Sequence, residues 1–345
     1  MAPQSASCSH PNGRCSTGDY DRLVAPAEGP SGDLLFLSGK DVERLLDLDA
    51  LLEALADAFV ALSAGRASAP PRAAARSADG LLGVMPAFVP GLGLEAKMVS
   101  VFPENESRGL PSHQALVLLF DDRDGRPLAV MDGTYITAVR TAAASALSAR
   151  LLALPETGIL AVVGAGVQGA AHLEAMGRLR RLHEVRIASR NYEHAEALAS
   201  RSSKARAVRS VEDAVRGADL ICCCTHSREP VLRREWLSPG AHVTSVGANV
   251  EGPELDAATV REGRLFVESR TAFEPPPAGA AELAGIDPHL GTELGEVLSG
   301  AAPGRTSETE VTVYKSMGHA LEDAAAGRLV YERALSERAG VWLSL

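Results

Sequence analysis

The chain has 345 residues, of which 46% are hydrophobic, and a formal net charge of −10. An acidic chain excludes nucleic acid or an anionic membrane surface as the main partner, because both require clustered Lys and Arg. No apolar run reaches the roughly 18 to 20 residues of a membrane span, and no signal peptide opens the chain, so we expect a cytoplasmic protein with two domains.

The first 32 residues are rich in Ser, Gly and Pro, and this composition predicts a disordered tail. Cys8, His10 and Cys15 are scattered within it, a pattern more typical of solvated residues than of a metal site, so no metal is expected. The other three cysteines, residues 222–224, lie in one apolar run and are predicted to pack as small hydrophobes on a buried strand.

A long amphipathic helix is predicted to follow the tail. Ser38 and Asp41 resemble an N-terminal cap, and apolar residues recur at helical spacing from Val42 to Leu62, before Gly65. Four apolar, β-rich segments come next, and RDGR at 123–126 forms a hairpin-like turn before the last of them. These segments, at 81–88, 94–102, 113–120 and 127–133, predict a mostly antiparallel sheet.

From about residue 137 the pattern changes to alternation of helices and strands. A helix over about 137–154 leads into ILAVVG, after which short apolar strands and amphipathic helices follow one another to RLFVES at 264–269. Such alternation predicts an α/β domain with a doubly wound parallel sheet. The last helix, from about 318 to 338, is long enough to pack back on the first domain. Its charged residues Glu322, Asp323 and Arg328 are predicted to face solvent or a dimer partner.

The segment GAGVQG places three glycines between a strand and a helix. Gly164 permits a tight turn, Gly166 lets the backbone approach a pyrophosphate, and Gly169 lets the helix pack on the sheet. The amide groups at the start of the helix then point towards the phosphates. This arrangement predicts a dinucleotide site; the alternative is a tight turn that binds no ligand.

The end of the next strand indicates which dinucleotide binds. An NAD site carries a carboxylate there for the ribose hydroxyls, whereas this chain has Ser189, Arg190 and Asn191. A guanidinium beside small polar groups favours a 2′-phosphate, so NADPH (NADP+) is the predicted cofactor. The alternative is that Arg190 is a solvated loop charge.

Lys97 interrupts the otherwise apolar segment LEAKMVSVF. A charged residue in such a strand lies either at an edge that faces water or in a site, and the residue pattern alone does not separate these.

Several separated blocks are similar to the ornithine cyclodeaminase/mu-crystallin family, over about residues 33–338. They include GLLGVMPAF, LPSHQALVLLF, LAVMDGTYITAVRTAAASALSARLL, GAGVQGAAH, PGAHVTSVGA and VYKSMGHALEDAAAGRLVY. The resemblance implies a Rossmann-type domain plus a split α/β substrate and dimerisation domain, and a homodimer. The ranges are 33–145 with 318–345 for the split domain and 146–317 for the NADP-binding domain. In the ketimine reductase branch of the family, NADPH reduces small cyclic imines such as piperideine-2-carboxylate.

The resemblance also implies roles for individual residues. Lys97 matches the active-site lysine, and Arg72 falls where the family keeps an arginine for the substrate carboxylate. Reduction of an imine needs a positive group for the carboxylate, a proton donor and a hydride, and Arg72, Lys97 and NADPH could fill these roles in turn. Cofactor contacts are implied for Ser112, His113, Arg140, Thr141, Gly164, Ala165, Gly166, Val167, Gln168, Ser189, Arg190, Asn191, His194, Thr225, Val246 and Ser316. Among these, Arg140 and Thr141 match a phosphate contact, and Thr225, Val246 and Ser316 match the nicotinamide side.

Departures from the family pattern separate its branches. Cyclodeaminases carry an aspartate where this chain has Asn249, and an amide cannot accept a proton, so ammonia loss is disfavoured relative to imine reduction. Thyroid hormone binding in the family uses an arginine close to the glycine turn before Asn249. Here Val250 stands near that place, so thyroid hormone is not expected as a ligand. The Pro-rich loop at 274–283 is expected to shape substrate choice. The open alternatives are a non-catalytic NADPH-bound protein and a cyclodeaminase or alanine dehydrogenase.

Overall fold

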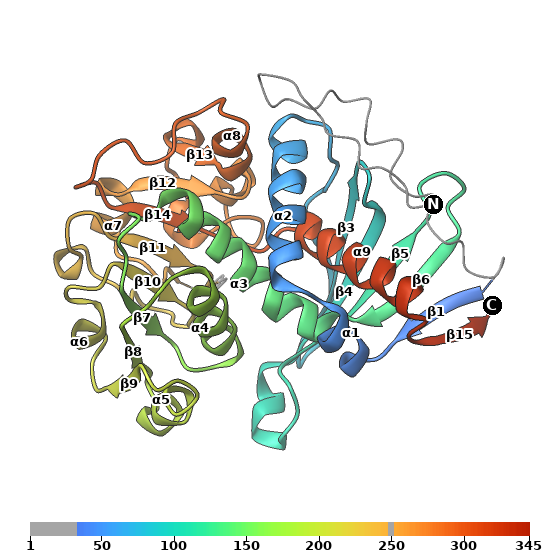
Figure 1. The fold of residues 1–345 in the computed structure, drawn as a ribbon, viewed down its shortest axis with the longest axis horizontal. Helices are drawn as coiled ribbons and strands as arrows, with labels where there is room; N and C mark the ends of the chain where they lie inside the picture. Colours follow the sequence, from blue (N-terminus) through green and yellow to red (C-terminus); the bar gives the residue numbers. More distant parts are fainter. Residues whose placement is uncertain (1–32, 248–251) are drawn as a thin grey trace, which may run out of the picture.

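The computed structural model describes residues 33–247 and 252–345. Two sheets lie side by side, one of seven strands and one of eight, and the long helix α3 (Gly133–Leu152) runs between them (Figure 1). Three features discussed above, the tail at 1–32, Asn249 and Val250, lie outside the described residues. Residue 145 lies inside α3, which contacts elements of both halves, so the domain ranges stay a prediction.

The seven-stranded sheet has the order β15-β1-β6-β5-β4-β3-β2. Its β2 to β6 pair antiparallel, as predicted, and β1 pairs parallel with β6. The strands are β1 (Asp33–Leu37), β2 (Ala73–Arg76), β3 (Leu81–Val89), β4 (Gly93–Val101), β5 (His113–Phe120), β6 (Pro127–Asp132) and β15 (Val341–Ser344). The sequence patterns above did not identify β1, β2 or β15.

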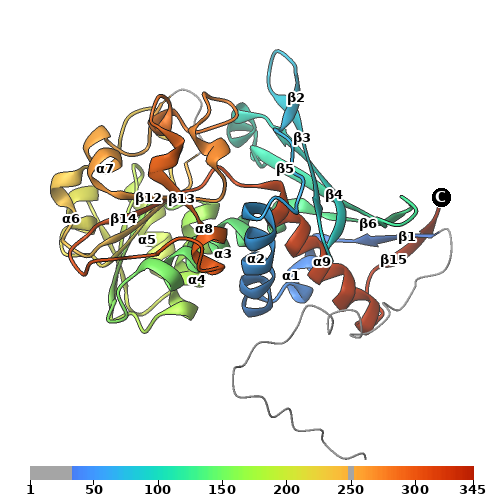
Figure 2. The ribbon, with the colours of Figure 1, turned by 90° about the horizontal axis from the view of Figure 1, so that it is seen from above.

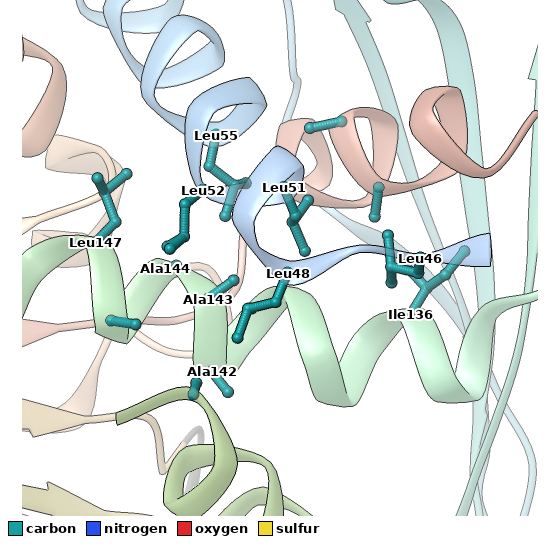
Figure 3. Close-up of a cluster of buried hydrophobic side chains, with 14 of the residues drawn as sticks. Leu46, Leu48, Leu51, Leu52, Leu55, Ile136, Ala142, Ala143, Ala144 and Leu147 are labelled. Carbon is teal, nitrogen blue, oxygen red and sulfur yellow. The ribbon is translucent and has the colours of Figure 1, made fainter. Parts of the chain in front are cut away.

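The single helix predicted before residue 65 is two helices, α1 (Gly39–Leu45) and α2 (Leu48–Ser63). The chain turns at Leu46, which has an extended backbone, and the Asp47 side chain caps α2 by accepting from the Ala50 amide. Acceptors of this type at an N-cap stabilise a new helix start. Figure 3 shows leucines of α2, among them Leu52 and Leu55, beside the alanine-rich face of α3.

The eight-stranded sheet is parallel throughout, as predicted, with the order β13-β12-β14-β11-β10-β7-β8-β9. Its strands are β7 (Ile159–Val163), β8 (Glu184–Ala188), β9 (Ala205–Val208), β10 (Leu220–Cys223), β11 (His242–Ser245), β12 (Arg264–Val267), β13 (Gly291–Glu293) and β14 (Thr312–Lys315). The helices of this half are α4 (Val167–Leu179), α5 (Tyr192–Ala199), α6 (Val211–Val215), α7 (Ala257–Glu262) and α8 (Leu294–Leu298). Short 3-10 helices are η2 (Pro103–Arg108), η3 (Arg234–Trp236), η4 (Arg270–Phe273), η5 (Ala281–Leu283) and η6 (Pro288–Leu290).

The cysteine run lies on and just after β10. Cys222 and Cys223 are fully buried, and burial raises the pKa of Cys222 to about 12, so these thiols stay protonated and pack as hydrophobes, as predicted. In the part of the chain described, no trio of His, Cys, Asp or Glu is placed to hold a metal ion. None of the helices described there has the length and apolarity to cross a membrane.

Helix α9 (Ala320–Glu337) follows β14 and returns the chain to the first sheet. In Figure 2, α1, α2 and α9 lie on the same side of that sheet, as the prediction for the last helix required. The helix packs tightly on the sheet at Gly327, where an added Cβ would lie 3.1 Å from the Val117 Cγ1 of β5. Helix α9 is therefore held against the sheet that carries Lys97 on β4.

Candidate active site

A buried cluster of charged side chains lies where β4, α3 and α9 meet. Lys97 from β4 and Arg140 from α3 are 2% and 4% exposed. The Lys97 Nζ lies 2.7 Å from the Asp323 Oδ2, and the Arg140 Nε lies 3.0 Å from the Asp323 Oδ1. The Arg140 Nη1 lies 2.6 Å from the Glu322 Oε2. Two cations and two carboxylates are therefore held against one another away from water, and we name these four residues the charge cluster.

The prediction that Glu322 and Asp323 face solvent or a dimer partner is wrong. Both side chains are fully buried, because the N-terminal half of α9 is enclosed between the strands of the first sheet and helices α2 and α3. Arg328, two turns nearer the C-terminus, is half-buried and pairs with the exposed Glu332. Only the second half of this helix is a surface helix.

Burial and neighbouring charge shift the pKa values within the charge cluster. Burial lowers the pKa of Lys97 and Arg140 lowers it further, whereas Asp323 opposes both. Burial disfavours the ionised form of Asp323, yet Arg140 and Lys97 outweigh it and lower that pKa. Burial raises the pKa of Glu322 to about 8, against the charge of Arg140. A lysine with a lowered pKa releases its proton more readily, so Lys97 is a stronger acid than a lysine in water.

Arg72 lies at the exposed mouth of the charge cluster. Its Nη2 donates to the carbonyl oxygens of Met317, at 2.8 Å, and Gly318, at 3.0 Å. Gly318 has a φ of +71°, and an added Cβ would lie 2.6 Å from the Arg140 Nη1. A glycine is needed there because any side chain would collide with Arg140. The turn after β14 thus brings Arg72 close to the cluster.

A cavity of about 50 Å³ opens beside Arg72. One wall consists of Pro70, Pro71 and Met85, and another of residues 318–320 at the start of α9. Thr271, Glu274 and Ala278 line it from the other half of the molecule. The beginning of the Pro-rich loop therefore lies beside the proposed carboxylate-binding arginine, where a substrate ring could contact it.

The glycine loop has the geometry that a pyrophosphate requires. Gly164 has a φ of +105°, and an added Cβ at Gly169 would lie 2.0 Å from the Gly164 carbonyl oxygen. No heavy atom lies within 4 Å of an added Cβ at Gly166, so the loop is open there. Helix α4 begins at Val167 without a side-chain cap, which leaves its first amide groups free to bind phosphate.

Four further predicted cofactor contacts lie in the glycine loop or on the helices beside it. Ala165 lies between the glycines, and Val167 is 70% exposed at the mouth of the loop. Thr141 is buried on α3, and its hydroxyl donates to the Thr137 carbonyl oxygen at 2.8 Å. The Gln168 amide nitrogen lies 3.5 Å from that same oxygen, which is too long for a strong hydrogen bond.

The predicted adenosine end lies after β8. Ser189 is half-buried, Arg190 is exposed, and Asn191 caps α5 by accepting from the Glu193 amide. His194 is exposed on α5. A second arginine, Arg209 after β9, was not predicted; its guanidinium lies 4.4 Å from the centre of the Tyr192 ring. Two guanidinium groups thus flank this edge of the sheet.

Glu254 organises the predicted nicotinamide end. Its carboxylate accepts from the amide and hydroxyl of Thr225, both at 2.7 Å, from the Ser245 hydroxyl at 2.7 Å and from the Gly247 amide at 2.9 Å. Val246 lies between the last two and donates its amide to the Cys223 carbonyl. This buried acid, which the sequence patterns did not identify, fixes the ends of β10 and β11 relative to each other.

Two further buried acids hold the turn after β14. Glu268 accepts from the Ser316 hydroxyl at 2.9 Å and from the amides of Met317 and Gly318. The Lys315 Nζ lies 2.9 Å from the Glu282 Oε1 and donates to the Gly247 carbonyl at 2.7 Å. Sequence reasoning identified Ser316 but neither acid.

Ser112 and His113 lie at the start of β5, at the boundary of the two halves. The Ser112 hydroxyl lies 3.1 Å from the His113 Nδ1. The His113 ring stacks on that of His226, which follows Thr225, with 5.7 Å between centroids and 14° between planes. The structure therefore brings His113 to the predicted nicotinamide end, and His226 is an additional residue there.

Comparison with known proteins gives a consistent result. Residues 33–338 match the model of the ornithine cyclodeaminase/mu-crystallin family. Ketimine reductase mu-crystallin of Mus musculus is 44% identical over 256 residues, which cover 73% of this chain and 80% of the mouse protein.

Two solved structures share the fold over nearly all of their length. Thermococcus litoralis Δ1-pyrroline-2-carboxylate reductase, in complex with NADH and L-proline, has a TM-score of 0.84 and 33% identity, and the match covers 89% of this chain and 99% of that one. An archaeal alanine dehydrogenase dimer with bound NAD has a TM-score of 0.84 and 31% identity, with 90% and 99% covered.

Proposed function

Because this chain belongs to the ornithine cyclodeaminase/mu-crystallin family, we propose that it is an NADPH-dependent reductase of small cyclic ketimines. The substrates are ring imines that carry a carboxylate, such as piperideine-2-carboxylate and its sulfur-containing relatives, and the products are cyclic amino acids. The observation that carries the proposal is the buried pair of Lys97 and Asp323 with Arg72 at the mouth of the same site. A proton donor and a carboxylate-binding cation are the two groups that this chemistry requires of the protein.

Each residue of the site has a physical role in this proposal. Arg72 binds the ring carboxylate, because its guanidinium presents several N–H donors and its Nη2 is bonded only to backbone carbonyls. Lys97 holds the proton that the substrate nitrogen receives as the carbon is reduced. Asp323 keeps the Lys97 Nζ in place, and Arg140 in turn holds Asp323. A nicotinamide nucleotide bound along the glycine loop supplies the hydride.

We propose that the nucleotide follows the carboxyl edge of the eight-stranded sheet. The open glycine loop and the uncapped start of α4 support a pyrophosphate site there. The proposed contacts are Ser112, His113, Arg140, Thr141, Gly164, Ala165, Gly166, Val167, Gln168, Ser189, Arg190, Asn191, His194, Thr225, Val246 and Ser316. For Arg140, whose Nε and Nη1 already bond to carboxylates, a phosphate contact would have to use its other N–H groups.

The proposal is tested by following NADPH oxidation by absorbance with piperideine-2-carboxylate as substrate. We expect multiple turnovers, with the saturated cyclic amino acid detected by mass spectrometry. Binding of NADPH without turnover of this imine or its sulfur-containing relatives would contradict the proposal and favour a non-catalytic nucleotide-binding protein.

Arg190 is expected to select NADPH over NADH. The two archaeal structures named above hold NADH and NAD, so the proposed preference depends on this chain's own loop, where an exposed guanidinium follows β8. Replacing Arg190 with alanine should raise the KM for NADPH by about tenfold or more and change that for NADH little, because one charge-assisted contact to phosphate contributes about 1.5–3 kcal/mol. Arg201→Ala, an exposed arginine just after α5, is the matched control. An equal loss for both cofactors would refute the preference.

We propose that two chains pair through the outer face of the seven-stranded sheet. The helices cover the other face (Figure 2), and exposed apolar side chains lie on the outer one, among them Phe36, Leu82 and Leu116. Exposed apolar patches of this kind mark protein interfaces. Sedimentation equilibrium should give twice the chain mass, and Leu82→Glu with Leu116→Glu should give the single mass; a wild-type monomer would contradict this.

A further inference from the structure

Glu95 is a buried carboxyl group on the same face of β4 as Lys97. Residues two apart on a strand point to one face with about 7 Å between their Cα atoms, and Glu95 is 3% exposed. Its cross-strand neighbours are Ala87 on β3 and Leu119 on β5, both buried. Helix α9 packs on this face of the sheet. Glu95 therefore lies next to the charge cluster, in the interface between the sheet and α9.

The ion pairs of the charge cluster do not include Glu95. Lys97 is paired with Asp323, and Arg140 with both Asp323 and Glu322. Within residues 33–247 and 252–345, neither oxygen of Glu95 has a hydrogen-bond partner. A buried carboxylate without a hydrogen bond or an ion pair is strongly disfavoured, and the group keeps its proton instead.

The charged groups around Glu95 come from three elements. Lys97 lies on its own strand, Asp323 on α9 and Arg140 on α3, whereas the adjoining strands present apolar side chains. Burial raises the pKa of Glu95 well above its usual range and Asp323 adds to this, while Lys97 and Arg140 oppose it. The same proximity acts on Lys97, because a negative charge on Glu95 favours the ammonium form.

We propose that Glu95 is a neutral carboxylic acid in the resting enzyme and that its ionisation at alkaline pH keeps Lys97 protonated. The proposal rests on the proposed function, in which Lys97 is the proton donor. As the pH rises, Glu95 releases its proton to solvent, and its new charge holds the proton on Lys97. The donor therefore stays charged at a pH where an isolated buried lysine would be neutral. Glu95 acts only through Lys97 and is thus a positioning residue.

The pH profile of kcat/KM for ketimine reduction tests this coupling. In Glu95→Gln the alkaline limb, where Lys97 loses its proton, should move to lower pH by about one unit, while the activity near pH 6 stays the same. Glu322 titrates in both proteins, so the difference isolates Glu95. Glu332→Gln removes an exposed carboxylate from α9 and should leave the limb in place. An unmoved limb in Glu95→Gln would overturn the proposal.

Thermal unfolding tests the state of Glu95 without any assay of activity. A carboxyl whose pKa is raised by folding contributes stability below its unfolded pKa, and this contribution is lost as the pH rises towards the folded pKa. Glutamine carries no such loss. The Tm of Glu95→Gln minus that of wild type should therefore increase steadily as the pH rises above the ordinary pKa of a glutamate. A constant deficit would show that Glu95 is ionised and paired, and would overturn the proposal even if the wild type reduces ketimines. An increasing difference in a protein without reductase activity would overturn only the proposed function.

Discussion

Replacing Lys97 with methionine is expected to lower kcat for ketimine reduction by about 10²- to 10⁴-fold, the usual contribution of a positioned general acid. Methionine keeps most of the volume of the lysine stem in a site that is 2% exposed, but it has no proton to donate. Asp323 keeps its contact with Arg140 in this variant, so the buried Asp323 carboxylate is still paired with one cation. The measurement is the steady-state rate of NADPH oxidation with saturating substrate.

Two observations separate loss of a proton donor from loss of the fold. NADPH binding, followed by nucleotide fluorescence, should be little changed in Lys97→Met, because the glycine loop is carried by β7 and α4 rather than by β4. Lys204→Met, at an exposed lysine before β9, should match the wild type in both measurements. Wild-type kcat in a folded Lys97→Met protein would remove Lys97 from the chemistry and leave the reductase function intact.

The sequence was most informative where the function of a residue depends on the backbone nearby. The strand, turn and helix around the glycine loop were predicted correctly, because they are adjacent in the chain and each glycine has a local steric reason. Lys97 was also identifiable, since a lysine inside an apolar strand must face either water or a site. The structure shows a buried lysine paired with an acid, which excludes the exposed edge.

The partners of Lys97 were not predictable in the same way. Glu322 and Asp323 begin a helix whose sequence resembles that of any surface helix with acidic residues in its first turn. Their burial follows from the return of α9 over the first sheet, a contact between segments more than 200 residues apart in sequence for Lys97 and Asp323. Strand β14, which the sequence patterns did not identify, is the element that leads into α9. Glu254 and Glu268 were missed for the same reason, as each bonds to the ends of other strands.

Among the substitutions proposed, Arg140→Met is expected to cause the largest loss in the free energy of unfolding, about 3–5 kcal/mol. The guanidinium is 4% exposed and bonds to both acids of α9, so its removal leaves the ionised Asp323 with only Lys97 and the Glu322 carboxyl without its hydrogen-bond donor. Urea denaturation followed by circular dichroism measures the change in the free energy of unfolding. If the two halves of the molecule unfold in separate transitions, the change in the free energy of unfolding should be read from the transition that NADPH binding does not shift.

The same substitution at Arg150 shows why burial and not the ion pair itself decides this outcome. Arg150 is also on α3 and pairs with Glu53, but these side chains are 34% and 70% exposed. Water replaces the lost partner there, so Arg150→Met should cost no more than about 1 kcal/mol. Equal, small losses in the two variants would mean that the carboxylates of α9 take up protons or water at little cost. The charge cluster would then be easily rearranged, and Lys97 would not be held in one position for proton transfer.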